Sequence, residues 1–312
     1  MPELPEVETV RAGLEPLVSG ATIDSVTVLR DSCVRHQGGG GAEFAMALTG
    51  ATLGAVVRRG KFLWFLLDCD TDYHGGDQGL ALSAHLGMSG QFRSFEGEVP
   101  APHSHCRARF ELSTPRGPLT LDFLDQRTFG YLHVEPLVPT ADGGPGGHGS
   151  FLPLLPRSVA HIARDALDPA VDVGRAEDAL RKGSRAIKSV LLDQTSISGI
   201  GNIYADEALW LAAIHPLRSA DSLTPAEASR LLASAREVMS KALAQGGTSF
   251  DALYVNVNGE SGYFSRDLAA YARAGEPCSR CGTLIAKATI GGRSSHWCPL
   301  CQWVENPGTA RD

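Results

Sequence analysis

The opening of the chain could carry a nucleophile, because removal of Met1 would leave Pro2 as the N-terminal residue. Its secondary amine could attack an electrophilic carbon and lose a leaving group as an iminium, the Schiff-base chemistry usually carried by lysine. An α-amine titrates near pKa ~8, about two units below lysine, so more of it is unprotonated at neutral pH. Glu3 and Glu6 are close enough in the sequence to move protons for this amine.

The same residues also have a purely structural interpretation. Pro5 suits the first turn of a helix, and glutamates near that end interact favourably with the helix dipole. Between residues 5 and 18 the apolar side chains recur at helical spacing, at Val7, Val10, Leu14, Leu17 and Val18. The opening therefore predicts a helix in either case, and the rest of the chain must decide whether Pro2 is also reactive.

Four of the seven cysteines form two Cys-x-x-Cys pairs with sixteen residues between the pairs: Cys278, Cys281, Cys298 and Cys301. Such pairs close a tetrahedral thiolate site for Zn²⁺, most simply on a β-hairpin. A redox function needs one pair and not two, so we predict a single structural zinc ion held by the four cysteines. The segment between the pairs contains Gly291, Gly292 and Arg293, which predicts a turn that presents one arginine.

A second motif runs from Ser198 to Glu207 and has the composition of a turn between two helices. Gly199 and Gly201 permit a tight turn with close backbone approach, and Asn202 is expected to cap the helix that follows. Exposed amides at such a turn hold phosphates well. A glycine pair is more often only a structural turn, so this motif alone does not assign a function.

Three further segments combine cations or bulky side chains with turns. The cationic segment 58–61 leads into an apolar strand. The segments 85–90 and 125–130 each place a bulky side chain, Met88 or Phe129, on a glycine-bounded turn. Exposing an apolar side chain at a turn is unfavourable unless it penetrates something, and insertion into a base stack is one such use. A solvated strand end and ordinary packing are the alternatives.

The composition is that of an ordinary globular protein with no membrane span or secretion signal, 43% hydrophobic and 20% charged over 312 residues. The length allows two or three domains. Clustering of the cysteines favours a metal site in a reducing cytosol, and the others are interpreted as buried thiols: Cys33, Cys69 and Cys106. A net charge of −7 argues mildly against nucleic-acid binding, but binding depends on local potential, and cations cluster near 58–61, 181–188 and 293.

The order of elements follows from the changing periodicity of the chain. Residues 22–135 predict an antiparallel sandwich or barrel, with strands at 22–29, 62–67, 108–112, 119–123 and 131–134 and surface loops at 38–41 and 71–79. Glycine and proline then dominate a linker at 137–157. The helices expected beyond it lie near 158–165, 175–182, 185–194, 202–212, 224–244 and 265–273, with a polar loop at 248–264.

Taken together, these segments resemble the formamidopyrimidine-DNA glycosylase family, bacterial repair enzymes that remove 8-oxoguanine and ring-opened purines. The resemblance covers nearly the whole chain in order: Pro-Glu-Leu-Pro-Glu at 2–6, Arg-Gly-Lys at 59–61, the turns at 85–90 and 125–130, the 199–207 motif, Gly-Gly-Thr-Ser at 246–249 and the cysteine ribbon. It implies a bifunctional glycosylase and AP lyase of base excision repair. It also implies double-stranded DNA with a damaged base as the partner, one zinc ion, and a monomer in the bacterial cytoplasm with no membrane association.

The resemblance assigns roles to individual residues. Pro2 would attack C1′ of the damaged nucleoside and form a ring-opened Schiff base, with Glu3 as acid/base at the sugar and Glu6 assisting. Lys61 would hold the phosphate beside the lesion and assist β-elimination, and Arg293 would support δ-elimination. The residues implied in DNA contact are Met88, Arg127 and Phe129, which would fill the gap left by the flipped base with Arg127 facing the orphaned cytosine, and His103, Asn202 and Lys188, which would bind the backbone.

The fold that the resemblance implies is α+β and multidomain. Its parts would be a helix-flanked antiparallel β-sandwich as the N-terminal catalytic domain at 1–136, the linker at 137–157, a helix-two-turn-helix DNA-binding domain at 158–247, a lesion-capping loop at 248–264 and a β-hairpin zinc ribbon at 265–312. DNA would lie in the cleft between the domains.

Some positions depart from the family pattern. Gly183 stands where relatives often have a basic residue, so Lys182 or Arg185 would have to supply that phosphate contact. Gln126 and Thr128 stand where relatives often have proline and a second arginine. The wedge residues themselves are kept.

Three alternatives remain open. The sister branch of the same superfamily excises oxidised pyrimidines, but it usually opens Pro-Glu-Gly and lacks the Met/Arg/Phe set found here. A non-catalytic zinc-ribbon protein that binds damaged DNA would not need Pro2, Glu3 and Lys61 together. A zinc ribbon that mediates only protein contacts leaves the wedge turns unexplained.

Overall fold

The structure is a computed structural model that describes residues 2–68, 79–248 and 267–303. The chain divides into two compact units, one of residues 1–161 with 245–263 and the other of residues 162–244 with 264–312. Among the described residues, none of the helices combines the length and the apolarity that a membrane span needs.

In its described part, the first unit is built on a sheet of nine strands in the order β5-β7-β6-β1-β2-β3-β4-β8-β9. Their bounds are β1 Thr22–Val28, β2 Thr52–Arg59, β3 Phe62–Asp68, β4 Leu80–His85, β5 Gly90–Glu96, β6 Cys106–Thr114, β7 Gly117–Asp125, β8 Tyr131–Pro139 and β9 Leu154–Pro156. The pairing between β1 and β2 is reduced to Thr22 with Thr52, so the order divides there into two groups of strands. The rings of Phe65 on β3 and Phe92 on β5 meet at 5.9 Å although these strands are not sheet neighbours, so the groups pack face to face as a sandwich.

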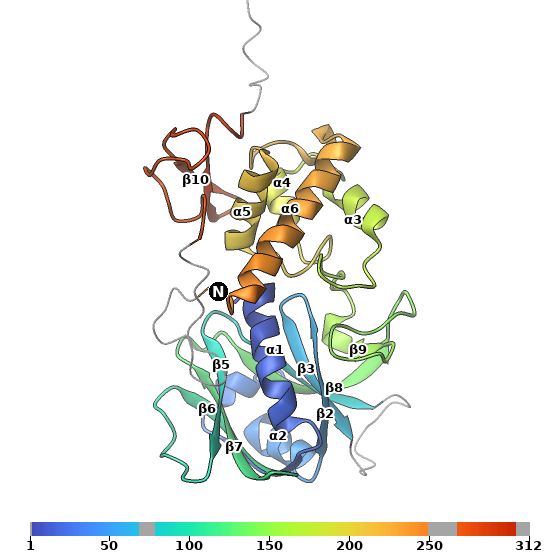
Figure 1. Cartoon of the computed structure of the whole chain (residues 1–312). Coiled ribbons are helices and arrows are strands. Elements are labelled where there is room, and N and C mark those ends of the chain that lie inside the picture. Colours follow the sequence, from blue (N-terminus) through green and yellow to red (C-terminus); the bar gives the residue numbers. More distant parts are fainter. Residues whose placement is uncertain (1, 69–78, 249–266, 304–312) are drawn as a thin grey trace, which may run out of the picture. The chain divides into compact units, whose positions relative to one another are not determined.

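Two helices cover this sandwich, α1 (Leu4–Val18) and α2 (Gly40–Leu48), together with the short 3₁₀ turns η1 (Asp31–Val34) and η2 (Arg157–Val159). α1 begins where the sequence predicts, with Pro5 in its first turn. Its apolar stripe is buried in the sandwich core at Val7, Val10, Leu14 and Val18. Figure 1 shows α1 lying along the sandwich, with β5, β6 and β7 to one side of it and β2, β3 and β8 to the other.

The sequence predicts a surface loop at 38–41, but α2 starts within this segment at Gly40. The helix forms because Phe44 and Leu48 are fully buried in the sandwich core. Their burial outweighs the low helix propensity of the glycines before them.

The segment 137–157 is not the free linker that its composition predicts. β9 pairs with the end of β8. Farther back, Arg58 and His148 exchange two backbone hydrogen bonds, of 2.9 and 2.8 Å. Gly147 permits this approach, because a Cβ there would lie 2.3 Å from the Arg58 carbonyl oxygen. The glycines therefore let the segment pack on β2.

The second unit contains α3 (Val173–Leu180), α4 (Ile187–Leu191), η3 (Ala220–Ser222), α5 (Asn202–Ala212), α6 (Pro225–Ala244) and the hairpin of β10 (Ala286–Ile290) and β11 (Arg293–Trp297). The predicted helices at 202–212 and 224–244 are confirmed almost to the residue. The hairpin turns through Gly291 and Gly292, whose φ angles of 57° and 74° are left-handed. Glycine adopts this conformation freely, and it matches the twist of a two-residue hairpin.

Two predicted helices are wrong, and in both cases the backbone has other partners. Of the segment 158–165, η2 takes only the start, and the Ala163 amide donates to the carbonyl of Gln194 instead. The described residues 267–273 form turns, because the Glu207 carboxylate accepts the backbone amides of residues 269, 270 and 271, each at 2.8 Å. The loops expected at 71–79 and 248–264 lie almost wholly outside the described residues.

Candidate active site and DNA-binding residues

Pro2, Glu3 and Glu6 lie together and buried at the start of α1. One oxygen of Glu6 accepts the Glu3 amide at 2.8 Å, which closes the first turn of the helix. The other accepts both the amide and the hydroxyl of Thr248 at 2.8 Å. Glu6 therefore fixes the end of the chain on which Pro2 lies. Thr248 belongs to a motif seen in the sequence, but no sequence signal indicated its partner.

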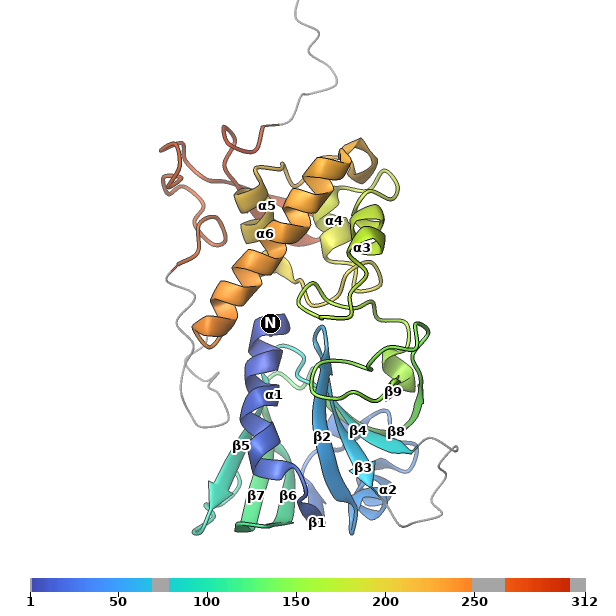
Figure 2. The same cartoon turned by 45° about the vertical axis from the view of Figure 1, so that its right-hand side comes forward.

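Lys61 occupies the tight turn between β2 and β3. This turn lies at the same end of the sandwich as the start of α1 (Figures 1 and 2). The neighbouring Arg58 and Arg59 are buried, and their guanidinium groups bind the carbonyls of Gly60 at 3.1 Å and Gly146 at 2.7 Å. Their function is therefore structural, whereas Lys61 is partly exposed.

The two turns expected to carry the wedge pack directly on each other. A Cβ on Gly87 would lie 2.5 Å from the Gly130 nitrogen, so only glycine fits there. The hydroxyl of Ser89 donates to Asp125 at 2.5 Å and accepts the Arg127 amide at 2.9 Å. The other carboxylate oxygen of Asp125 accepts the Gly130 amide at 2.7 Å. The two turns thus form one platform.

The three expected wedge residues stand exposed on this platform. Phe129 is 53% exposed and Met88 is 37% exposed. The Arg127 guanidinium lies 5.7 Å from the centre of the Phe129 ring. Large apolar side chains held out of the core on a rigid turn are what insertion into a base stack requires.

Arg35 supports the platform, and sequence reasoning did not find it. Its guanidinium donates to the carbonyls of Gly130 at 2.7 Å and Phe129 at 3.0 Å, and it lies over the Tyr131 ring. Thr128 adopts a left-handed φ of 56°, which is costly for a β-branched residue. Arg35 holds the turn on the far side of that residue.

The three residues expected to bind the DNA backbone differ in their exposure to solvent. His103 is exposed just before β6, where its Nδ1 accepts the His105 amide at 3.1 Å. Asn202 is not the helix cap, because Gly201 is the N-cap of α5 and Asn202 is its first helical residue. The Asn202 side chain donates to the Ser294 carbonyl at 2.9 Å, and its buried oxygen has no hydrogen-bond partner in the described part of the chain.

Lys188, which is also expected to contact the DNA backbone, does not lie at the surface of this structure. The Lys188 side chain is fully buried, and its ammonium donates to Asp206 at 2.6 Å and to the Ser294 carbonyl at 2.9 Å. Arg293, in contrast, is exposed directly after the Gly291–Gly292 turn, as the sequence predicts.

The sulfur atoms of the four predicted zinc ligands all lie within 4.8 Å of one another. Tetrahedral Zn–S bonds of about 2.3 Å place sulfurs ~3.8 Å apart, so the cluster has the right size for one zinc ion. The Trp210 indole N–H points at the Cys278 sulfur at 3.4 Å, and hydrogen bonds, foremost from Thr283, lower the pKa of Cys281 to about 6. Both contacts favour thiolate, which is the form that binds zinc.

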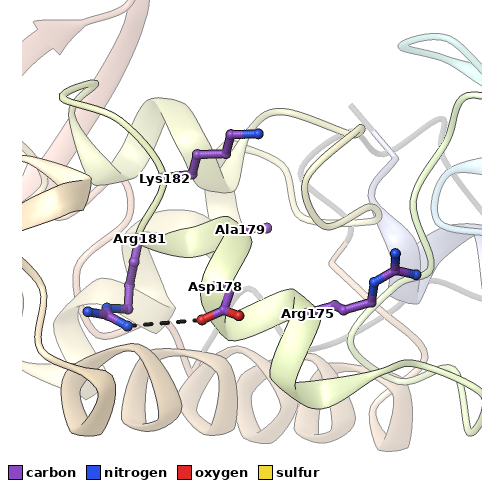
Figure 3. Close-up of a pocket in the computed structure, with 5 residues that line it drawn as sticks. All are labelled: Arg175, Asp178, Ala179, Arg181 and Lys182. Atoms are coloured by element: carbon purple, nitrogen blue, oxygen red, sulfur yellow. Dashed lines mark ion pairs between the residues drawn. The ribbon is translucent and has the colours of Figure 1, made fainter.

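An open pocket of about 490 Å³ lies on α3 and the turn after it, next to Gly183. Figure 3 shows Lys182 and Arg175 on either side of Ala179, while Arg181 points the other way to pair with Asp178. Arg185 is the second candidate for the phosphate contact that Gly183 cannot make. Its guanidinium is paired with Asp193 at 3.0 Å. Lys182 is exposed and has no ion pair among the described residues.

Three family models match the chain in order. They are the formamidopyrimidine-DNA glycosylase N-terminal domain over residues 1–132, the H2TH domain of the same enzymes over residues 162–252, and the zinc finger found in FPG and IleRS over residues 275–303. The chain belongs to the formamidopyrimidine-DNA glycosylase family. It is a DNA-repair glycosylase, and its four-cysteine cluster is the zinc finger of that family.

Relatives cover the chain from end to end. The formamidopyrimidine-DNA glycosylases of Leifsonia xyli and Corynebacterium glutamicum (strain ATCC 13032) are 49% and 50% identical over 303 residues, with 97% of this chain and 99% of each relative covered. The crystal structure of MutM (Fpg) from Thermus thermophilus is 35% identical with a TM-score of 0.75, covering 96% of this chain and 98% of that one. Lactococcus lactis Fpg bound to abasic-site DNA is 31% identical with a TM-score of 0.75, covering 97% and 100%. The predicted family, sandwich, helical domain and zinc hairpin are confirmed.

Proposed function

We propose that this chain is a bifunctional glycosylase and AP lyase that excises oxidised purines from double-stranded DNA through the amine of Pro2. The observation that carries the proposal is the buried start of α1, where Glu6 holds the backbone beside Pro2 and Glu3. Once Met1 is removed, the Pro2 nitrogen attacks C1′ and the bond from C1′ to the base breaks. The base takes up a proton as it leaves, and opening of the sugar ring gives an iminium on Pro2.

Glu3 serves as the acid/base at the sugar in this scheme, because a proton must reach the ring oxygen when the sugar opens. Both oxygens of Glu6 already accept backbone hydrogen bonds, so we assign Glu6 to positioning as well as to assistance. Lys61 binds the phosphate beside the lesion. Loss of a proton from C2′ then expels the 3′ phosphate in β-elimination, and Arg293 supports expulsion of the 5′ phosphate in δ-elimination.

For DNA binding, Met88, Arg127 and Phe129 fill the gap left by the everted nucleotide, and the platform described above holds them ready. Contacts with the DNA backbone come from His103, Asn202 and Lys182. Lys182 replaces the basic residue that relatives often have at the position of Gly183. We further propose that the first unit is the catalytic domain, that the protein acts as a monomer and that it works in the bacterial cytoplasm. Lactococcus lactis Fpg variants bound to Fapy-dG DNA share this fold, with 31% identity and a TM-score of 0.76 for one of them.

Borohydride trapping tests the nucleophile. Reduction of the iminium should leave the chain covalently attached to a duplex that pairs 8-oxoguanine with cytosine, and mass spectrometry of the digested adduct should locate the link on the Pro2 nitrogen. Pro2→Gly should lower the yield of adduct strongly. Normal trapping of Pro2→Gly, or a link at an internal lysine, would show that the proposed nucleophile is wrong.

A panel of lesions tests the purine preference. Lactococcus lactis Fpg, 31% identical to this chain, has been crystallised with DNA that contains an oxidised pyrimidine, so the panel must include one. We expect faster single-turnover excision of 8-oxoguanine and formamidopyrimidines than of thymine glycol. The reverse order would place the chain with the pyrimidine-specific branch.

A further inference from the structure

Lys188 and Asp206 form an ion pair in which both side chains are completely buried, with the ammonium 2.6 Å from one carboxylate oxygen. Removing two charges from water is costly, and the attraction between them repays that cost only when further hydrogen bonds complete the site. The other hydrogen bonds of Lys188 and Asp206 therefore identify the part of the chain that this ion pair positions.

Those contacts lead to β11. The Lys188 ammonium also donates to the Ser294 carbonyl at 2.9 Å, and the Asn202 side chain donates to the same carbonyl at 2.9 Å. The second oxygen of Asp206 accepts the His296 amide at 2.9 Å and lies 3.0 Å from the Nδ1 of the His296 ring. Residues of α4 and α5 thus hold β11 at two positions, and the first of them directly follows Arg293.

The other side of the hairpin turn lies close to α4. A Cβ on Gly291 would lie 3.1 Å from the hydroxyl of Ser189, the neighbour of Lys188 on α4. Arg293 therefore lies between Ser294, whose carbonyl is hydrogen-bonded to Lys188 and Asn202, and a turn that lies close to α4, although its own side chain is exposed. An exposed, flexible guanidinium on a fixed backbone can reach only a limited volume of space.

We propose that Lys188 is a positioning residue for Arg293, and that the buried Lys188–Asp206 pair sets where this guanidinium meets the phosphate expelled in δ-elimination. This inference rests on the proposed function of Arg293. A lysine suits the position because its compact ammonium offers three donors, of which Asp206 and the Ser294 carbonyl take two. A displacement of about 1 Å at a reacting group can cost on the order of 100-fold in rate. A small shift of the hairpin that carries Arg293 should therefore slow δ-elimination.

The experiment compares products within one reaction. The double variant Lys188→Met/Asp206→Leu removes both charges and leaves neither of them buried alone. On an 8-oxoguanine duplex under single-turnover conditions, base release, the β-elimination product and the δ-elimination product are quantified separately. We expect the ratio of δ to β product to fall about 10-fold while base release changes less than about 2-fold. Zinc content is measured for each variant to establish that the finger is intact.

Glu207→Gln is the matched control, because Glu207 is a buried carboxylate of α5 that binds residues 269–271 and not the hairpin. It should lower the free energy of unfolding and leave the product ratio unchanged. Arg293→Ala separates the two proposals. If it leaves the ratio unchanged, the function assigned to Arg293 is wrong. If Arg293→Ala lowers the ratio and the double variant does not, or if the double variant slows base release and δ-elimination equally, the positioning function of Lys188 is wrong.

Discussion

Glu6 and Thr248 are 242 positions apart in the chain, yet two hydrogen bonds of 2.8 Å join one carboxylate oxygen of Glu6 to the amide and hydroxyl of Thr248. The second oxygen of Glu6 accepts the Glu3 amide at 2.8 Å. Both Glu6 and Thr248 are buried. One carboxylate therefore fastens a distant segment of the chain beside Pro2.

Thr248→Val should weaken this connection. The substitution keeps the shape of the side chain and removes the hydroxyl donor, so we expect a loss of about 1 kcal/mol in the free energy of unfolding. The rate of borohydride trapping should fall as well, because the start of α1 is less firmly held. Urea unfolding and trapping kinetics measure the two effects. Thr49→Val is the control, because that exposed hydroxyl donates to the nearby Ala45 carbonyl at the end of α2. Equal stability of Thr248→Val and the unmodified chain would contradict the prediction.

Lowering the pH should destabilise the fold, because His85 has a depressed pKa in the folded chain. Burial, together with the charges of Lys61 and Arg35, lowers the pKa of His85 from 6.5 to about 4. Its neutral Nδ1 accepts the Gly87 amide at 3.1 Å. Between pH 6.5 and about 4 the unfolded chain therefore binds a proton that the folded chain does not, so stability is lost as the pH falls through this window.

The loss should approach roughly 3 kcal/mol at the acidic end of the window. His85→Gln keeps an acceptor for the Gly87 amide and does not titrate, so its stability should depend less on pH. Urea unfolding from about pH 7 to about pH 4.5 gives the two curves. Parallel curves for the two proteins would show that His85 is not responsible.

Arg35→Ala should loosen the turn that carries Phe129. The change removes two hydrogen bonds to consecutive carbonyls, worth about 1 kcal/mol each, at an exposed site. We therefore expect a loss of about 1 kcal/mol in the free energy of unfolding and about 10-fold faster amide exchange in residues 125–130, measured by urea unfolding and by hydrogen exchange with mass spectrometry. Arg30→Ala, at an exposed arginine of the same segment, should leave this exchange unchanged. The same protection in both variants would contradict a supporting function for Arg35.

Lys182 and Arg185 should contribute unequally to DNA affinity. Lys182→Ala should reduce the slope of log K against log salt by about one, the value for the loss of one phosphate contact. Arg185→Ala should change the slope less, because Arg185 is already paired with Asp193 at 3.0 Å. Fluorescence titration of one duplex over a range of salt concentrations measures both slopes. A larger effect of Arg185→Ala would assign the contact to that residue.

The sequence by itself determined the features that depend on local chemistry. The spacing of the four cysteines requires only that two turns come together, and the apolar periodicity of α1 requires only one neighbouring surface. The turn that presents Arg293 follows from two glycines in a hairpin. The order of the motifs was enough to indicate the family, because each motif is short and can be recognised from its own residues without knowledge of the fold.

Only the tertiary structure decided which partners the polar groups take. Lys188 belongs to a cationic stretch of the sequence that suits the protein surface, yet its side chain is buried against Asp206 and β11. The segment 265–273 has helical composition, but the carboxylate of Glu207 satisfies its amides and no helix forms in its described residues, 267–273. Buried donors and acceptors must be paired, and those pairs join residues up to hundreds of positions apart. No local pattern encodes them, so the positions of the reactive side chains emerge only when the chain has folded.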